Sequence, residues 1–129
     1  MSLRLLTPDL VRAIHDAVLN PGELTGEAMN KSLEGALARV DTRLAYGMIG
    51  DVSDLAAAYA LAVATGHCFN DGNKRTAFRT MNAALVFNGV RLAWDVEEIG
   101  PLIIEVAQGH VDEGALAGWL RGQQRASKA

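Results

Sequence analysis

The chain has 129 residues, of which 50% are apolar and 21% charged, and this balance predicts one globular domain over residues 1–129 and excludes a multidomain protein. With 12 basic against 15 acidic residues the net charge is -3, so there is no general basic field and we expect no direct nucleic-acid binding. No apolar run approaches the roughly 20 residues that span a bilayer, and the first residues lack the apolar stretch of a signal peptide, so we expect a cytoplasmic protein with no membrane partner.

Apolar residues recur at helical spacing, and aromatic residues make up only 5% of the chain, which favours an all-α fold. Thr7 followed by Pro8 predicts the start of a helix over residues 8–19. One face of this helix is apolar: Leu10, Ile14 and Val18. Residues 20–31 contain proline and glycine and predict a loop, after which Ser32 is expected to cap a second helix.

The third helix is expected to start at Asp51 or Ser53, and Gly66 fits the left-handed residue that would close it. A fourth helix is expected over residues 73–87, before a turn and a short extended piece over residues 90–94. The side chains expected to be buried in the fourth helix are Ala77, Met81, Ala84 and Leu85.

Two more helices complete a predicted set of about six. Asp95 and Glu98 resemble a capping box at the start of the fifth helix, which we expect to be interrupted or kinked around Gly100 and Pro101. Asp112 is expected to cap the sixth helix, and the polar end of the chain after residue 122 is expected to fray.

The residues capable of chemistry concentrate in the loop between the third and fourth predicted helices, residues 67–76. A helix start exposes unpaired backbone N–H groups and the positive end of the helix dipole, which suits an anion such as phosphate. If that anion is a nucleotide, Asp71 can hold Mg²⁺ and His67 can accept a proton near neutral pH. The lysine of the loop does not directly follow a glycine, which excludes the phosphate loop of P-loop NTPases.

The loop resembles the signature of the Fic/Doc family, HxFx(D/E)(G/A)N followed by Gly or Lys and then Arg, and it fills every specified position from His67 to Arg75. Lys74 stands where adenylyl-transferring Fic proteins usually carry Gly, and Phe78 stands where they carry a second Arg. Lysine at this place is similar to the Doc branch, the toxins of toxin–antitoxin pairs. The resemblance covers most of the chain and implies a compact helical bundle with its active site at the loop entering the fourth helix.

This resemblance implies a role for six residues of the loop. His67 is the implied general base that activates a target hydroxyl, and Asp71 is the implied Mg²⁺ ligand. The residues implied to bind nucleotide phosphates are Gly72, Asn73, Lys74 and Arg75. ATP and Mg²⁺ are the implied cofactors, and the lysine implies that the γ-phosphate, rather than the α-phosphate, is presented to the base.

The resemblance also implies two protein partners. Elongation factor Tu is the implied target, and residues 20–31 fall where the family has a flap that pairs with the target backbone. The inhibitor would be a Phd-like antitoxin acting in trans, because the self-inhibitory pattern of Fic proteins needs Ser or Thr four residues before a glutamate, whereas Asn30 stands there before Glu34.

Five further side chains receive no catalytic role. Phe69 is the implied structural anchor of the motif, and Cys68 is expected to be a buried apolar side chain rather than a thiolate or a metal ligand. Arg79 is not expected to replace the second arginine of Fic proteins. His15 and His110 have no partner pattern and are expected to be ordinary residues at helix edges.

Three functions are therefore open. The first is a Doc-like toxin with serine/threonine protein kinase activity that blocks translation. The second is a protein adenylyltransferase with an atypical motif, and the third is a catalytically silent domain that binds an antitoxin or a nucleotide. The presence of both His67 and Asp71 favours an enzyme.

Overall fold

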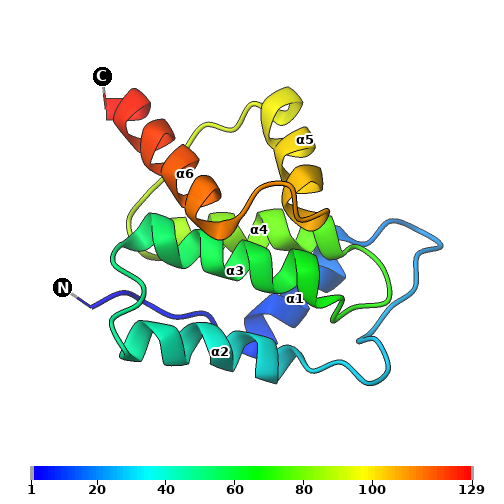
Figure 1. Ribbon diagram of the computed structural model, residues 1–129. Helices are drawn as coiled ribbons and strands as arrows, with labels where there is room; N and C mark the ends of the chain where they lie inside the picture. The colour runs from blue at the N-terminus through cyan, green and yellow to red at the C-terminus, as the bar shows by residue number, and fades with distance from the viewer. Residues whose placement is uncertain (1, 129) are drawn as a thin grey trace.

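The computed structural model describes residues 2–128, which form six α-helices (Figure 1). They are α1 (Pro8–Val18), α2 (Leu33–Ala45), α3 (Val52–Gly66), α4 (Asn73–Phe87), α5 (Val96–Ala107) and α6 (Glu113–Lys128). Within residues 2–128 the extended structure is limited to an isolated antiparallel bridge between Glu27 and Phe69. The prediction of an all-α fold with about six helices is confirmed.

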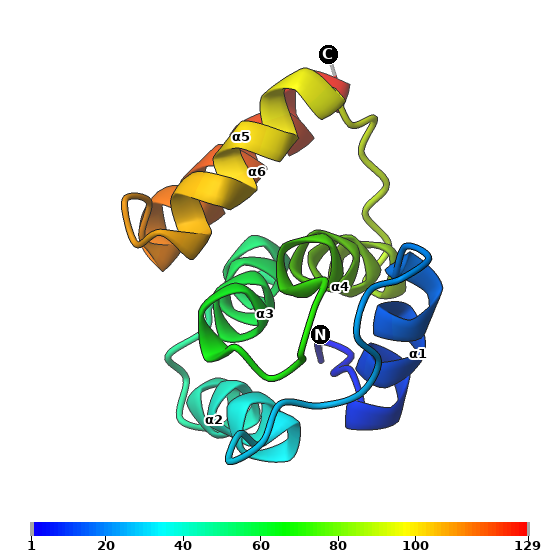
Figure 2. The same ribbon diagram turned by 90° about the vertical axis from the view of Figure 1, so that its right-hand side faces the viewer.

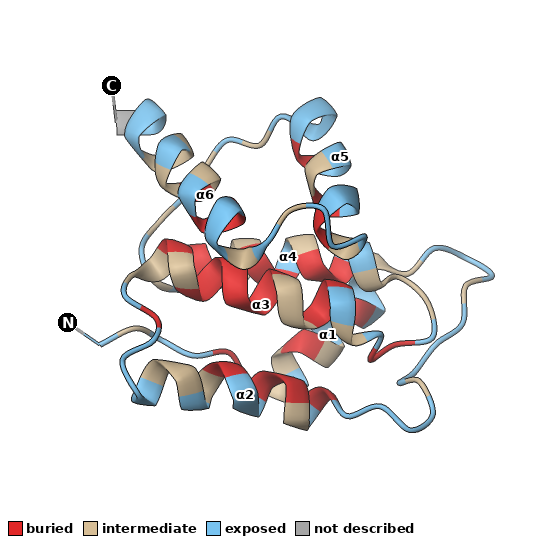
Figure 3. Ribbon diagram, in the orientation of Figure 1, coloured by how far each residue is buried: buried red, intermediate tan, exposed pale blue. Residues whose placement is uncertain are grey.

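Helices α3 and α4 lie side by side at the centre of the molecule, with α1 and α2 on one side and α5 and α6 on the other (Figure 2). Most of α3 is buried (Figure 3). Its inward positions are largely alanine, and a methyl side chain lets neighbouring helices approach closely. This central pair matters for function because the loop that joins α3 to α4 carries residues 67–72.

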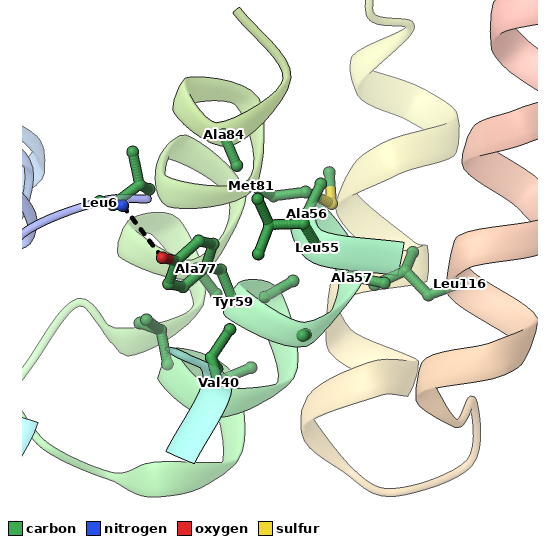
Figure 4. Close-up of a cluster of buried hydrophobic side chains, with 14 of the residues drawn as sticks. Leu6, Val40, Leu55, Ala56, Ala57, Tyr59, Ala77, Met81, Ala84 and Leu116 are labelled. Atoms are coloured by element: carbon green, nitrogen blue, oxygen red, sulfur yellow. Dashed lines mark hydrogen bonds between the residues drawn. The ribbon is translucent and has the colours of Figure 1, made fainter. Parts of the chain in front are cut away.

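The core between the helices is built on large apolar side chains of α3 and α4, including Leu55 and Met81 (Figure 4). All four α4 residues predicted to be buried are buried. Tyr59 is fully buried too, and its hydroxyl accepts a hydrogen bond from the backbone N–H of Leu6 at 2.9 Å. This bond fixes the segment before α1 against the central helices.

Helix starts follow the local sequence closely. The side chains that accept hydrogen bonds from first-turn N–H groups are Thr7, Ser32, Asp51, Asp95 and Asp112. Asp51, not Ser53, caps α3. Only one half of the capping box predicted at α5 forms. Asp95 caps the helix, but the Glu98 carboxylate accepts a hydrogen bond from the indole of Trp119 at 3.2 Å and does not bond to the backbone of Asp95.

The predicted interruption of α5 and the predicted fraying after residue 122 are wrong, whereas a kink at Pro101 stays a prediction. Helix α5 continues unbroken through Pro101. The residue before a proline is disfavoured in helical conformation partly by its Cβ, and Gly100 has none, so the helix tolerates the proline. Helix α6 runs to Lys128 instead of fraying, since Gln123 and Gln124 remain half-buried and keep the helix packed. No helix in residues 2–128 has the length and apolarity to cross a membrane.

Candidate active site

His67 stands at the end of α3 in a left-handed conformation, with φ 51° and ψ 38°. The left-handed residue was expected at Gly66, which instead belongs to the helix. A Cβ at position 66 would lie 3.1 Å from the sulfur of Cys68, a tight approach that glycine avoids, and the left-handed conformation, which is uncommon for a residue with a side chain, belongs to His67. The imidazole is exposed, and it makes no hydrogen bond within residues 2–128.

The loop after His67 is held by buried side chains on both sides of its chain. Phe69 is buried, as implied for the anchor of the motif. The side-chain amide of Asn73 bonds to both the N–H and the carbonyl of Phe69. Asn73 accepts a hydrogen bond from the Phe69 N–H at 3.1 Å and donates one to the Phe69 carbonyl at 2.9 Å. Cys68 is buried and burial raises the pKa of its thiol, which agrees with an apolar role.

His15 corrects the sequence interpretation, because it is not an edge residue but lies fully buried on the inner face of α1. Its Nε2 atom is 2.7 Å from the backbone oxygen of Asp71, and its ring stacks on Phe69 with 3.9 Å between centroids. The local sequence offered one signal: position 15 lies four residues after the buried Val11 and so on the same helical face. His110 is exposed in the turn after α5 and pairs with Glu105.

Residues 20–31 run beside the motif loop and bond to its backbone. The Asn70 N–H donates to the carbonyl of Gly26 at 3.2 Å, and the Ala28 N–H donates to the carbonyl of Cys68 at 2.7 Å. The side chain of Asn70 donates to the carbonyl of Thr25 at 2.9 Å. The segment therefore lies alongside the motif, and its role as a flap stays a prediction.

The same segment contacts two of the predicted site residues directly. The Leu24 N–H donates to Asp71 Oδ2 at 2.7 Å, and the carboxylate of Glu23 forms an ion pair with the guanidinium of Arg75. The hydrogen bond from Arg75 lowers the pKa of Glu23, so this carboxylate is ionised at neutral pH. Sequence reasoning gave no role to Glu23.

A cavity of about 290 Å³ brings five of the six predicted site residues together. They are His67, Asp71, Gly72, Asn73 and Lys74. The sixth, Arg75, turns toward the neighbouring groove between α1, α4 and α5. The far wall comes from the end of α5, where Ile104, Ala107 and Gln108 line the cavity. Nothing in the local sequence linked these three residues to the motif.

Comparison with known proteins identifies the family. Residues 5–85 match the Fic/DOC family, a span that contains the whole motif loop, α1 to α3 and all of α4 except its last two residues. The chain belongs to the Fic/DOC family. It is 37% identical over 123 residues to the protein named protein kinase doc from Escherichia phage P1, covering 92% of this chain and 94% of that protein. It is 39% identical over 94 residues to toxin Doc of Mycolicibacterium smegmatis, covering 70% and 72%.

In this Fic/DOC protein the donor set around Asp71 fits Mg²⁺. Asp71 Oδ1 accepts no hydrogen bond within residues 2–128, and the described residues contain no cluster of three or more His, Cys, Asp or Glu side chains. Mg²⁺ binds through one or two carboxylates together with water and substrate phosphates, so one aspartate suffices. Zinc, which takes three or four protein ligands, does not fit.

Beside the cavity lies a larger apolar groove of about 920 Å³ between α1, α4 and α5. Leu10, Ile14 and Val18 line it, so the apolar face predicted for α1 forms a wall of this groove, and Leu10 also packs against the core. Lys74 and Ile104 belong to both hollows, and Arg75 and Arg79 add positive charge at the groove. Arg79 lies over the ring of Phe78, 5.6 Å from its centroid, and does not line the smaller cavity.

Proposed function

We propose that this protein is a Doc-type toxin, an ATP- and Mg²⁺-dependent serine/threonine protein kinase that phosphorylates elongation factor Tu in the cytoplasm and so blocks translation. The observation that carries the proposal is the gathering of His67, Asp71 and Lys74 around one cavity in a member of the Fic/DOC family. Its similarity to a relative named protein kinase doc favours phosphoryl transfer over the other chemistries of the family.

His67 would act as the general base in this reaction. Its exposed imidazole at the mouth of the cavity accepts the proton of a target hydroxyl while that oxygen forms a bond to the γ-phosphorus. The bond between the γ-phosphorus and the bridging oxygen breaks, and ADP leaves. Proton transfer of this kind typically contributes about 10²- to 10⁴-fold to the rate.

The other motif residues would hold the nucleotide. Asp71 would bind Mg²⁺, which when bound neutralises charge on the phosphates. Gly72 caps α4 with φ 78° and without a side-chain cap, so the first N–H groups of the helix are free to bind phosphate oxygens. Lys74 adds a positive charge in the cavity, and Arg75 at the adjoining groove adds another once Glu23 releases it.

The side-chain amide of Asn73 would serve this site indirectly. Both of its polar atoms bond to the backbone of Phe69, so its contribution to phosphate binding would come from its backbone N–H.

Lys74 separates the kinase from the alternative activity, an adenylyltransferase. A lysine at this place lines the cavity, where the glycine of Fic proteins would leave space. Lys74→Gly is therefore expected to weaken phosphoryl transfer or to redirect the reaction toward adenylyl transfer. Unchanged γ-phosphate transfer by this variant would count against a role for the lysine in choosing the reaction.

An inhibitory antitoxin of the Phd type would occupy the apolar groove. Phe87, Val96 and Ile104 are large apolar side chains that line this groove and remain exposed. An amphipathic helix buries such a stripe with residues at spacings of three and four, and acidic residues at one end would meet Arg75 and Arg79. Because Lys74 belongs to both groove and cavity, a chain bound in the groove would also obstruct the catalytic residues.

A cell-free translation system tests the proposal. Adding the purified protein with ATP and Mg²⁺ is expected to stop protein synthesis, and adding fresh elongation factor Tu is expected to restore it. Arrest that persists after the addition of fresh factor would point to a different target, and arrest by His67→Ala equal to that of the wild type would support a silent binding domain.

A further inference from the structure

His15 is a buried imidazole whose two nitrogens face the motif loop and its own helix. Its side chain is 1% exposed and sits between α1 and the loop that carries residues 67–72. A buried polar side chain is costly unless it is hydrogen-bonded, so its partners show what the residue does. The histidine has two such contacts with the loop, one through a nitrogen and one through the face of its ring.

The first contact fixes a backbone carbonyl. His15 Nε2 lies 2.7 Å from the carbonyl oxygen of Asp71, and because a carbonyl oxygen only accepts, Nε2 carries the hydrogen and donates it. The other nitrogen, Nδ1, lies 3.6 Å from a carboxylate oxygen of Asp16, an exposed residue on the same helix. The imidazole is therefore a donor aimed at the motif loop.

The second contact is a parallel stack. The His15 ring lies on the ring of Phe69 with 3.9 Å between centroids and 9° between planes. One side chain thus contacts the loop two residues apart, at Phe69 and at Asp71. The ring also approaches Gly72, where an added Cβ would lie 3.7 Å from His15 Cδ2 and 3.3 Å from a methyl group of Leu19. Helix α1 therefore presses directly on the start of α4.

The carbonyl that His15 holds belongs to the peptide joining Asp71 to Gly72. This peptide is planar and trans, so fixing its carbonyl also fixes the direction of the Gly72 N–H, which points away from His15. It also fixes the backbone from which the Asp71 side chain extends and from which α4 begins. Both the candidate metal ligand and the candidate phosphate-binding N–H groups depend on this peptide.

We propose that His15 is a positioning residue of the active site, which holds the Asp71–Gly72 peptide through its Nε2–H and so aims the metal-binding carboxylate and the first N–H groups of α4. This inference rests on the proposed function, because it assigns His15 a purpose in phosphoryl transfer.

Two substitutions test separately the hydrogen-bond donor of His15 and its aromatic ring. His15→Phe keeps an aromatic ring that can stack on Phe69 but removes the donor, whereas His15→Gln places an amide donor near the Nε2 position and removes the ring. Each variant is measured in two ways. Amide hydrogen exchange without nucleotide reports the order of the loop at the N–H groups of Phe69 and Thr76, and steady-state kinetics report kcat and KM for ATP.

His15→Phe is expected to speed exchange at the N–H groups of Phe69 in the loop and Thr76 in the first turn of α4 by about tenfold or more, while exchange in α3 stays unchanged. Its kcat is expected to fall by about tenfold or more, with a change in KM of less than about threefold, because geometry at the reacting atoms is lost rather than binding surface. His15→Gln is expected to keep the loop amides and kcat within about threefold of the wild type.

Three results would overturn the inference: normal loop exchange in His15→Phe, faster loop exchange with wild-type kcat, or equal losses in both variants together with faster exchange throughout α3. The last would show that His15 serves general stability. Failure of the proposed function is distinguishable, because the wild type would then transfer no phosphoryl group, and the exchange measurement alone would decide whether His15 orders the loop.

Discussion

Glu23 and Arg75 form an ion pair that joins the segment at residues 20–31 to the first turn of α4. The next residue, Leu24, donates its N–H to the carboxylate of Asp71 at 2.7 Å. Two neighbouring residues of the segment thus bind residues of the candidate site. Glu23 pairs with Arg75, a candidate phosphate-binding residue, and Leu24 bonds to Asp71, the candidate metal ligand. A nucleotide that uses Arg75 must displace Glu23, because a carboxylate and a phosphate compete for the same guanidinium.

Glu23→Gln is expected to tighten the binding of ATP in the presence of Mg²⁺ by several-fold, because the uncharged amide competes less well for Arg75. Binding is measured by calorimetry with the purified protein. Glu27→Gln is the matched control, since Glu27 lies on the same segment but pairs with Arg12. Weaker ATP binding in Glu23→Gln would show instead that the glutamate holds Arg75 in its productive position.

Asp71→Asn is expected to abolish the part of ATP affinity that depends on Mg²⁺ while leaving the fold intact. The amide oxygen of asparagine can still accept the hydrogen bond from Leu24, so the segment stays in place, but the charge that binds the cation is lost. Calorimetric titration of ATP with Mg²⁺ and with a chelator measures this difference. A variant that keeps the full Mg²⁺ effect would remove Asp71 from the metal site.

Phe87→Asp is expected to prevent inhibition by an antitoxin without lowering kinase activity. The Phe87 side chain lines the apolar groove, is 46% exposed, and is absent from the lining of the catalytic cavity. A carboxylate there would be buried by a bound apolar helix at high cost. Tyr46→Asp is the matched control, because Tyr46 is 79% exposed and lies outside the groove. Equal inhibition of both variants and the wild type would place the antitoxin elsewhere.

Tyr59→Phe tests the core that supports the site. Burial raises the pKa of Tyr59 to about 12, so its hydroxyl stays protonated and can donate to Asp41 while it accepts from the Leu6 N–H. Removing the hydroxyl leaves that N–H without a partner and is expected to lower the free energy of unfolding by about 1–3 kcal/mol. Thermal denaturation measures the change, with Tyr46→Phe as an exposed control. A melting temperature equal to that of the wild type would contradict the assigned bond.

Much of the fold was predictable because its determinants are local. Thr7, Ser32 and Asp51 each accept a hydrogen bond from the N–H group three residues further on, and the motif loop is one uninterrupted stretch of sequence. The role of His15 could not be predicted, because it depends on a contact between residues far apart in the sequence. His15 meets Asp71 across 56 positions.

The cavity wall formed by the end of α5 arises only when the helices pack. The end of α3 has a local feature instead: a Cβ at position 66 would lie 3.1 Å from the sulfur of Cys68, two residues further on, and His67 adopts the left-handed conformation.

The most direct test of the proposed chemistry is label transfer to purified elongation factor Tu from ATP labelled in the γ-phosphate, with a parallel sample labelled in the α-phosphate. Wild-type protein, His67→Ala and the exposed control His110→Ala are compared. We expect transfer of γ label alone, equal in the wild type and His110→Ala and reduced by about 10²- to 10⁴-fold in His67→Ala. Transfer of α label, or γ-label transfer by His67→Ala at the wild-type rate, would contradict a kinase that uses His67 as its base.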